Sequence, residues 1–273
     1  MKDKISLAGD LGSGKSTVSR ILIEALGAEY YSTGSIVRSI AERMGMTVVE
    51  LNQYMETHPE IDNEIDDGLV RLGEEDRLLI IDSRMAWHFT PGTFKVYLST
   101  DIETSALRIM NANRKGEHAL TLEGTIADTR ARRQSEQKRY SEQYGVDIKD
   151  LFNYSLVVDT TYATPEEIAG LIITAFGEWK ENRDRKICYI SPERLNFSED
   201  GFDQERMLEC TDIIERGETP PPVTAFEIEG EFYVEGGIET AMAYALNMHT
   251  FVPLTLVKGE IGDRKYVKMS NSL

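Results

Sequence analysis

The clearest candidates for chemistry are Gly9 to Ser16, which form the octapeptide GDLGSGKS. This stretch fits the phosphate-loop pattern of a glycine, four residues and then Gly-Lys-Ser, which cradles the phosphates of a nucleoside triphosphate. Gly9, Gly12 and Gly14 permit conformations and close approaches that a Cβ would block, so backbone N–H groups can point at phosphate oxygens. The octapeptide therefore predicts a binding site for ATP.

Side chains of the same loop complete the expected donor chemistry. Lys15 is placed to reach the β- and γ-phosphates, and Ser16 can offer its hydroxyl to Mg²⁺, with Thr17 next to it on the first turn of a helix. Residues 5–8 are an apolar run typical of a buried strand, and residues 16–26 have the apolar spacing of a helix. The loop thus has the context that the motif requires, and ATP and Mg²⁺ are the expected cofactors.

The first two thirds of the chain alternate short apolar runs with helical patterns, which predicts a parallel sheet covered by helices. The expected strands are 5–8, 30–31, 78–82, 95–98 and 156–159. The expected helices are 16–26, 35–44, 48–57, 61–74, 102–114, 121–144 and 165–179. We therefore expect the fold class α/β, with a three-layer α/β/α parallel-sheet domain around the phosphate loop over residues 1–180.

Residues 178–186 form a charged stretch, EWKENRDRK, which we interpret as a helix end followed by a linker. Beyond it the pattern changes to strands at 187–190, 223–229, 232–234 and 251–257 and helices at 203–216 and 238–248. At 273 residues the chain is long enough for two domains. We therefore expect a small α+β domain over residues 187–273.

The composition argues against several classes of partner. A formal net charge of −17 disfavours a nucleic-acid polymer and an anionic membrane, because both attract basic surfaces. The two cysteines lie far apart, without the spacing of metal ligands, which fits a reducing cytosol. The first residues, MKDKISLAGD, lack the apolar core of a signal peptide. We expect a soluble, cytoplasmic protein without a membrane span.

Further charged residues favour phosphoryl transfer over ATP binding alone. Thr33 and Gly34 form a turn that opens a helix, and Arg38 follows one turn later, where it can clamp a second phosphate. Asp82 and Arg84 follow the third strand, at the carboxyl end where ligands of parallel sheets bind. Asp82 would orient Mg²⁺ through water, and Arg84 would hold the acceptor.

Arginines also gather in two later helical stretches of this acidic chain, at Arg108, Arg114, Arg130, Arg132, Arg133 and Arg139. Transfer of a γ-phosphoryl group builds negative charge on oxygen, so a mobile arginine-bearing lid would stabilise the transition state and exclude water. The alternative is a pair of solvated helix faces with i,i+4 ion pairs to Glu123, Asp128, Glu136 and Glu142. As a set, the arginines favour the lid.

Asp62 and Asp66 lie one helical turn apart in the stretch PEIDNEID. They could face an acceptor base and accept hydrogen bonds from the exocyclic amine of cytosine. A solvated helix face would explain the same spacing, and the pattern favours that plainer interpretation.

Several motifs in this order resemble the short archaeal form of the cytidylate kinases, over about residues 3–175. They are GDLGSGKSTVSRIL, YSTGSIVRSIAERMGM, VELNQYMETHPEIDNEID, IIDSRMAW and RARRQSEQKRYSEQYGVDIKDLFNYSLVVDTT. The resemblance implies donor-phosphate binding by Gly12, Ser13, Gly14, Lys15, Ser16 and Thr17. It implies acceptor contacts for Thr33, Arg38 and Arg84. It implies lid roles for Arg132 and Arg139 and donor-side contacts for Arg108 and Arg114.

Residues 187–257 resemble the ParB-like nuclease or sulfiredoxin-like fold, in the stretches ISPERL, FDQERMLECTDIIERG, PPPVTAFEIEGEFYVEGG and IETAMAYALNMHTFVPLTLV. In that family an arginine at a helix start grips nucleotide phosphate, and Glu239 takes its position here. Since a carboxylate repels phosphate, we expect no triphosphate in this domain. It would serve folding, oligomer contacts or regulation, or bind an uncharged or cationic small ligand.

The sequence thus predicts an ATP-dependent nucleoside monophosphate kinase of cytidylate-kinase type, acting on CMP or dCMP. Its partner would be this small substrate, with a possible homo-oligomer through the domain over 187–273. Ser83 stands where the family usually has glycine, which adds a side chain beside the acceptor. Two alternatives stay open: an ATP-binding regulator whose nucleotide state is passed to the second domain, and a kinase for another small metabolite.

Overall fold

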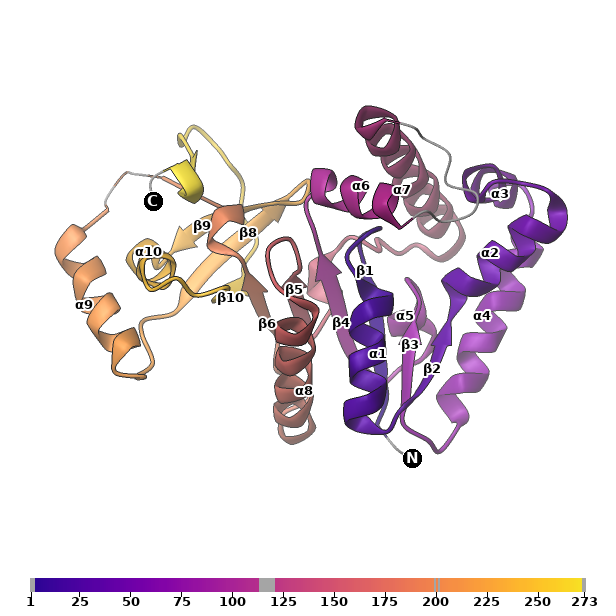
Figure 1. Cartoon of the computed structure of the whole chain (residues 1–273), viewed down its shortest axis with the longest axis horizontal. Helices are drawn as coiled ribbons and strands as arrows, with labels where there is room; N and C mark the ends of the chain where they lie inside the picture. Colours follow the sequence, from indigo (N-terminus) through magenta and orange to yellow (C-terminus); the bar gives the residue numbers. More distant parts are fainter. Residues whose placement is uncertain (1–2, 113–120, 199, 201, 272–273) are drawn as a thin grey trace.

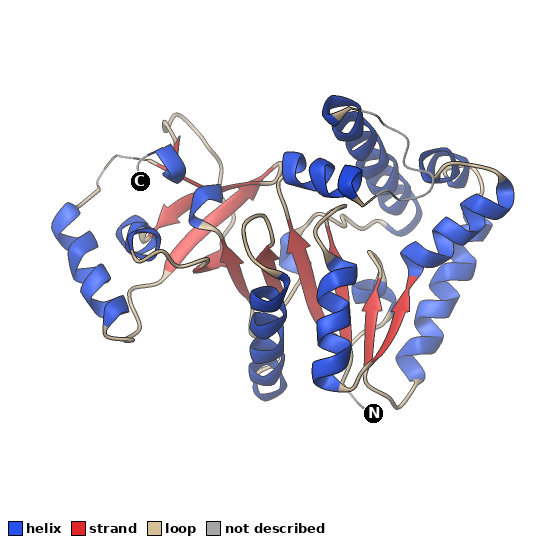
Figure 2. Cartoon of the chain, in the orientation of Figure 1, coloured by secondary structure: helices blue, strands red, loops and turns tan. Residues whose placement is uncertain are grey.

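The computed structural model describes residues 3–112, 121–198, 200 and 202–271, and these residues form one sheet of eleven strands (Figure 1, Figure 2). From edge to edge its strands are β11 (Val267–Lys268), β7 (Leu195–Phe197), β9 (Glu231–Gly236), β8 (Val223–Ile228), β10 (Val252–Leu256), β6 (Ile187–Ile190), β5 (Leu156–Asp159), β4 (Phe94–Ser99), β1 (Ile5–Gly9), β3 (Leu79–Asp82) and β2 (Glu29–Ser32). The helices are α1 (Lys15–Leu26), α2 (Thr33–Met44), α3 (Val48–Met55), α4 (Pro59–Glu74), α5 (Ala86–Phe89), α6 (Ile102–Asn111), α7 (Leu122–Tyr144), α8 (Pro165–Glu181), α9 (Gln204–Glu215) and α10 (Ile238–Leu246).

The strands from β2 to β6 run parallel and are covered on both faces. Successive residues of β3 point to opposite faces, as the period of a strand requires. Ile80 packs in the core beneath α1 and α8, whereas Ile81 packs in a second core with residues of α4 and α5. The predicted three-layer α/β/α arrangement is therefore confirmed, and the phosphate loop lies between β1 and α1.

The remaining strands extend the same sheet into the C-terminal part. Strand β6 pairs parallel with β5 and antiparallel with β10, so hydrogen bonding continues across residue 187. One apolar cluster contains Tyr97 and Val157 together with Cys188 and Leu254. Helices α9 and α10 pack against each other at the far end of the molecule from α2 and α4 (Figure 1). The division into domains at 1–180 and 187–273 stays a proposal.

Most expected elements are present, with ends that differ by a few residues. Helix α6 ends at Asn111, before the expected end at Arg114, and Arg114 lies outside the described residues. The sequence prediction missed α5, β7 and β11, because such short elements show no hydrophobic period. The described residues include no helix with the length and apolarity needed to cross a membrane.

Candidate functional site

The backbone of the phosphate loop packs closely against β4 and α6, and this packing explains why the loop contains glycines. Gly9 has a φ of 147°, and a Cβ there would lie 2.4 Å from the carbonyl oxygen of Leu98 on β4. Gly12 has a φ of 70°, and its Cβ would lie 2.5 Å from the carbonyl oxygen of Ser105 on α6. Gly14, with a φ of 84°, precedes α1 and allows the sharp turn into the helix. The loop is thus a cradle that any side chain at these positions would disturb.

Lys15 begins α1, and its ammonium lies inside the loop. Its Nζ donates to the carbonyl oxygens of Gly9, at 3.0 Å, and Asp10, at 2.9 Å. Burial lowers the pKa of Lys15 to about 8, although the carboxylate of Asp82 favours the charged form. Ser16 and Thr17 follow in the first turn of α1, where their hydroxyls and N–H groups lie at the positive end of the helix.

Asp82 ends β3 beside the phosphate loop. Its Oδ2 accepts a hydrogen bond of 2.8 Å from the Tyr30 hydroxyl, and its carbonyl oxygen accepts one of 3.4 Å from Thr33. The described residues contain no group of three or more His, Cys, Asp or Glu arranged around a metal ion. A hydroxyl from Ser16 and a carboxylate from Asp82 are nevertheless the hard oxygen ligands that Mg²⁺ accepts when phosphates and waters supply the rest. The oxygen atoms of Ser16 and Asp82 therefore fit a magnesium ion that also binds a nucleotide.

A cavity of about 370 Å³ adjoins the outer side of the loop and is lined by Gly12, Ser13, Gly14, Thr17, Val18, Arg108, Ile109, Ala112, Ala163, Pro165 and Ile168. We call it the donor cavity. Arg108 is fixed at its wall, because its Nη2 donates to the carbonyl oxygens of Thr160, at 2.6 Å, and Thr161, at 3.2 Å. Arg108 thus lies beside the predicted donor residues, while Arg114 is not among the residues described.

A second cavity, which we call the acceptor cavity, lies where Ser83 and Arg84 follow β3 and where α2 begins. It is lined by Thr33, Gly34, Val37, Asn52, Met55, Asp62, Ile65, Asp66, Ser83, Arg84, Met85, Arg132, Glu136, Arg139 and Tyr140. Seven of these residues were expected from sequence: Thr33, Gly34, Asp62, Asp66, Arg84, Arg132 and Arg139. Five of the six expected acceptor residues are therefore in the lining, together with the two expected lid arginines, but the sixth acceptor residue, Arg38, is not. It donates to Ser35 on the exposed side of α2, next to Gly34.

Asp62 and Asp66 of α4 are buried in this cavity, with only 3% of Asp62 and 7% of Asp66 exposed. Asp62 Oδ2 lies 2.7 Å from Arg139 Nε, and Asp66 accepts a hydrogen bond from the Tyr144 hydroxyl. Burial raises the pKa of each to about 6, against the effect of Arg139. The interpretation of these residues as a solvated helix face is therefore wrong: α4 turns them inward.

Glu136 on α7 holds two of the predicted arginines in place. Its carboxylate oxygens lie 2.6 Å from Arg84 Nε and 3.0 Å from Arg132 Nε, and only 3% of the residue is exposed. Burial alone would raise the pKa of Glu136, but these guanidinium groups outweigh burial and hold the pKa below its ordinary value. The sequence pattern predicts Glu136 only as a possible ion-pair partner on a solvated helix face. The i,i+4 spacing predicts the ion pair between Arg132 and Glu136. It cannot predict the ion pair between Arg84 and Glu136, which are far apart in the sequence.

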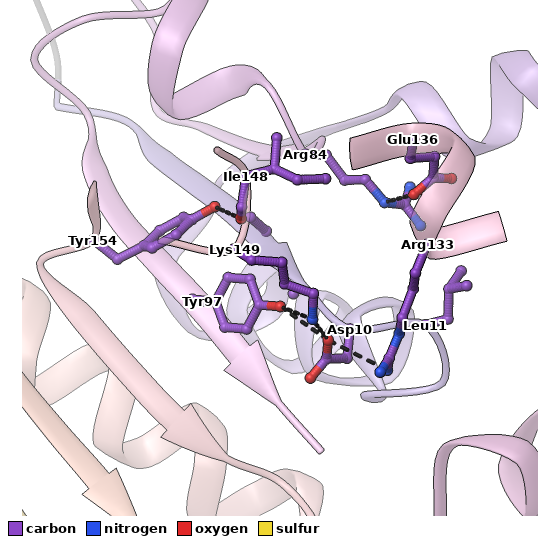
Figure 3. A pocket seen from close by; sticks show the side chains of 11 residues that line it. Asp10, Leu11, Arg84, Tyr97, Arg133, Glu136, Ile148, Lys149 and Tyr154 are labelled. Atoms are coloured by element: carbon purple, nitrogen blue, oxygen red, sulfur yellow. Dashed lines mark hydrogen bonds and ion pairs between the residues drawn. The ribbon is translucent and has the colours of Figure 1, made fainter. Parts of the chain in front are cut away.

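A further charged group, which no local pattern in the sequence indicates, joins the phosphate loop to α7 (Figure 3). Asp10 Oδ1 accepts from the Tyr97 hydroxyl at 2.9 Å, forms an ion pair with Lys149, and lies 3.3 Å from Arg133 Nη2. Its Oδ2 accepts from the backbone N–H of Thr100 at 3.0 Å. Burial alone would raise the pKa of Asp10, but the two cations hold it well below its ordinary value. We call Asp10, Tyr97, Arg133 and Lys149 the Asp10 cluster.

Comparison with known proteins indicates the family to which the chain belongs. Residues 9–147, half of the chain, match a family model described as an AAA domain. A cytidylate kinase of Thermoplasma volcanium is 36% identical over 179 residues, which cover 64% of this chain and 92% of that enzyme. An S-adenosylmethionine-dependent nucleotide dehydratase of Lacinutrix mariniflava is 38% identical over 195 residues, but these cover 70% of this chain and only 39% of that protein.

The C-terminal part has weaker relations. Sulfiredoxin from Arabidopsis thaliana aligns with a TM-score of 0.24 and 20% identity, over 27% of this chain and 85% of that protein, too slight a likeness to carry an assignment. For residues 9–147 the family match and the near-complete coverage of the Thermoplasma enzyme agree with the loop and cavities described above. The chain therefore belongs to the AAA domain family that it matches and to the cytidylate kinase family of phosphate-loop kinases.

Proposed function

We propose that the protein transfers the γ-phosphoryl group of MgATP to the phosphate of a nucleoside monophosphate, with CMP or dCMP as the preferred acceptor. The observation that carries this proposal is the acceptor cavity, which combines arginines with buried carboxylates. It shares Arg84 and Glu136 with the cavity that Gly9 and Asp10 of the phosphate loop line. Burial is the main cause of the lowered pKa of Lys15, and the positive charges of Arg84 and Arg132, which line the acceptor cavity, lower it further. Three cations thus converge between donor and acceptor.

The chemistry needs positioning and positive charge more than a general base. The acceptor phosphate is already anionic, so the site has to hold two polyanions together in line. Lys15 would hold the donor phosphates, Arg84 the acceptor phosphate, and Arg132 and Arg139 the group in transfer. Ser16 and Asp82 would hold Mg²⁺, and its positive charge would neutralise the phosphates of the donor.

The buried carboxylates support cytosine as the acceptor base. Asp62 and Asp66 lie on one wall of the acceptor cavity, and Asn52, which is 3% exposed, lines the same cavity. An ionised carboxylate accepts hydrogen bonds only, so it favours the exocyclic amine of cytosine over the carbonyl oxygen at the same position of uracil. A site that pairs with a substrate amine discriminates strongly against analogues that lack it.

The first experiment incubates the full chain with MgATP and a panel of nucleoside monophosphates and small hydroxyl acceptors, and identifies phosphorylated products by mass. We expect CDP or dCDP from wild type, none from Lys15→Ala, and unchanged product from the control Lys265→Ala, which alters an exposed lysine. ATP binding without product from any acceptor would refute the proposed function and favour the nucleotide-dependent regulator. Product from a non-nucleotide acceptor alone would favour a metabolite kinase.

A second experiment tests the base. We expect Asp62→Asn and Asp66→Asn to lower kcat/KM for CMP by about tenfold to a hundredfold while affecting UMP less. The matched control is Asp67→Asn, because Asp67 lies on the same helix but is exposed. Equal losses for CMP and UMP would show that the carboxylates do not recognise the base.

For the C-terminal part we propose a supporting role and no nucleotide site of its own. Glu239 lies in the first turn of α10, where it is 9% exposed, so a phosphate there would meet a buried carboxylate. Repulsion between the two anions disfavours triphosphate binding. Oligomer contacts through this part stay a proposal.

A further inference from the structure

Arg194 of the C-terminal part is buried, with 3% of its surface exposed, and reaches into the first part of the chain. It lies in a short 3-10 helix, Pro192–Arg194, that precedes β7. Its Nη1 donates to Asp159 Oδ1 at 3.0 Å and to the Thr161 hydroxyl at 3.2 Å, and its Nη2 donates to the carbonyl oxygen of Gly230 in the β8–β9 turn. The guanidinium therefore connects a C-terminal hairpin to the end of β5.

Asp159 in turn binds the loop between β5 and α8. It is fully buried, and its Oδ1 accepts from the backbone N–H of Thr161 at 3.1 Å and from the Thr161 hydroxyl at 2.6 Å. The carbonyl oxygens of Thr160 and Thr161 in turn accept from Arg108. A continuous series of hydrogen bonds thus runs from Gly230 to Arg108.

The loop at the end of this series forms a wall of the donor cavity. Ala163 in this loop and Pro165 directly after it line that cavity together with Gly14 and Arg108. A buried carboxylate without a cation is costly, so without Arg194 the loop would be driven towards conformations in which Asp159 meets water. Binding a nucleotide would then also require ordering the loop, which weakens affinity.

We propose that Arg194 is a positioning residue for the donor nucleotide, although it lies in the C-terminal part and is not among the residues that line the donor cavity. The proposal rests on the proposed function, because it takes ATP as the donor. It gives the C-terminal part a definite role: through one ion pair, this part fixes the wall against which the donor binds.

The test compares Arg194→Met and Arg194→Lys with the control Asn196→Ala in the full chain. Asn196 is buried two residues further along and bonds to Phe232 within the C-terminal part. We expect Arg194→Met to raise the dissociation constant of MgATP, measured by titration calorimetry without acceptor, about tenfold or more. KM for ATP should rise with it, while KM for the acceptor at saturating ATP stays constant. Arg194→Lys should restore part of the affinity, and Asn196→Ala should leave it unchanged.

Several results would overturn the proposal. One is an ATP affinity in Arg194→Met equal to that of wild type. Another is an equal loss of ATP affinity in Asn196→Ala, which would indicate general destabilisation. If Arg194→Met does not fold, Thr161→Val tests the same connection by removing the hydroxyl that bonds to both Asp159 and Arg194, and unchanged ATP affinity there would also count against it. A wild-type protein that binds no ATP would instead refute the proposed function, and this inference with it.

Discussion

Lys15 shows how burial at a single residue limits the pH range in which the site works. Its pKa is lowered to about 8 because the ammonium is removed from water inside the phosphate loop. The charged form pairs with phosphate, and the neutral amine cannot. We therefore expect kcat/KM for ATP, which reports the free enzyme, to fall as pH rises through about 8.

This profile is measured between pH 7 and 9.5, at saturating acceptor and constant ionic strength. Lys15→Arg provides the comparison, because a guanidinium stays protonated throughout this range. Its residual activity should lack the fall near pH 8. A wild-type profile that is flat to pH 9.5 would contradict the prediction.

Asp62 and Asp66 should make the choice of acceptor base depend on pH. Their pKa values are raised, whereas the pKa of Lys15 is lowered. Burial raises the pKa of both to about 6, so they are ionised acceptors above pH 6 and become protonated below it. A protonated carboxyl can donate to a carbonyl oxygen, which suits uracil. We expect the ratio of kcat/KM for CMP to that for UMP to fall as pH drops from 7.5 to 5. The paired variant Asp62→Asn, Asp66→Asn should show a ratio independent of pH, whereas a constant ratio in wild type would refute the prediction.

At the level of elements, the Asp10 cluster fastens the phosphate loop to α7 and to the segment that follows it. The pKa of Asp10 is lowered in the folded chain, so its ionised form stabilises the fold above its ordinary pKa of 3.8. This stabilisation is lost as pH falls below 3.8 towards the lowered pKa. Asp10→Asn also leaves Lys149 and Arg133 close together without a carboxylate. We expect this variant to lose about 1–3 kcal/mol of unfolding free energy at pH 7 and progressively less below pH 4.

Urea unfolding followed by circular dichroism at several pH values measures this difference. The control is Asp67→Asn, whose carboxylate is exposed on α4. The same loss at pH 3 as at pH 7 would contradict the prediction, because it would mean that the ionisation of Asp10 contributes nothing.

Local pattern predicted the elements well and the pairings between them poorly. The glycines and Lys15 of the phosphate loop could be placed because each follows from its neighbours in sequence. Asp10 and Lys149 are 139 positions apart, and no local spacing indicates that they meet. For the same reason the sequence could not decide whether Asp62 faces solvent: its burial depends on Arg139 of α7, which packs across the cavity.

For the molecule as a whole, the main question is whether the two parts of the chain are independent. Strand β6 pairs with β5 on one side and β10 on the other, and one apolar cluster includes Trp87, Tyr97 and Leu254. Cooperative unfolding follows where elements share a sheet and a core. The sequence pattern at residues 178–186 predicted a linker, but such a pattern cannot show whether the next strand returns to the same sheet.

Leu254→Ala tests this continuity. Leu254 is 2% exposed on β10, and its truncation should cost about 2–5 kcal/mol through the cavity that it leaves. Of the two tryptophans of the chain, Trp87 lies in the shared cluster, whereas Trp179 on α8 packs in the core of the parallel strands. The measurement therefore uses a Trp87→Phe background, in which the fluorescence of Trp179 reports the first part. If the parts unfold together, the tryptophan transition in urea should shift by as much as the circular dichroism transition of the whole chain. The exposed variant Lys265→Ala should shift neither. A tryptophan transition that stays in place while circular dichroism shows an earlier step would establish two independent domains, and donor binding would then gain little from Arg194.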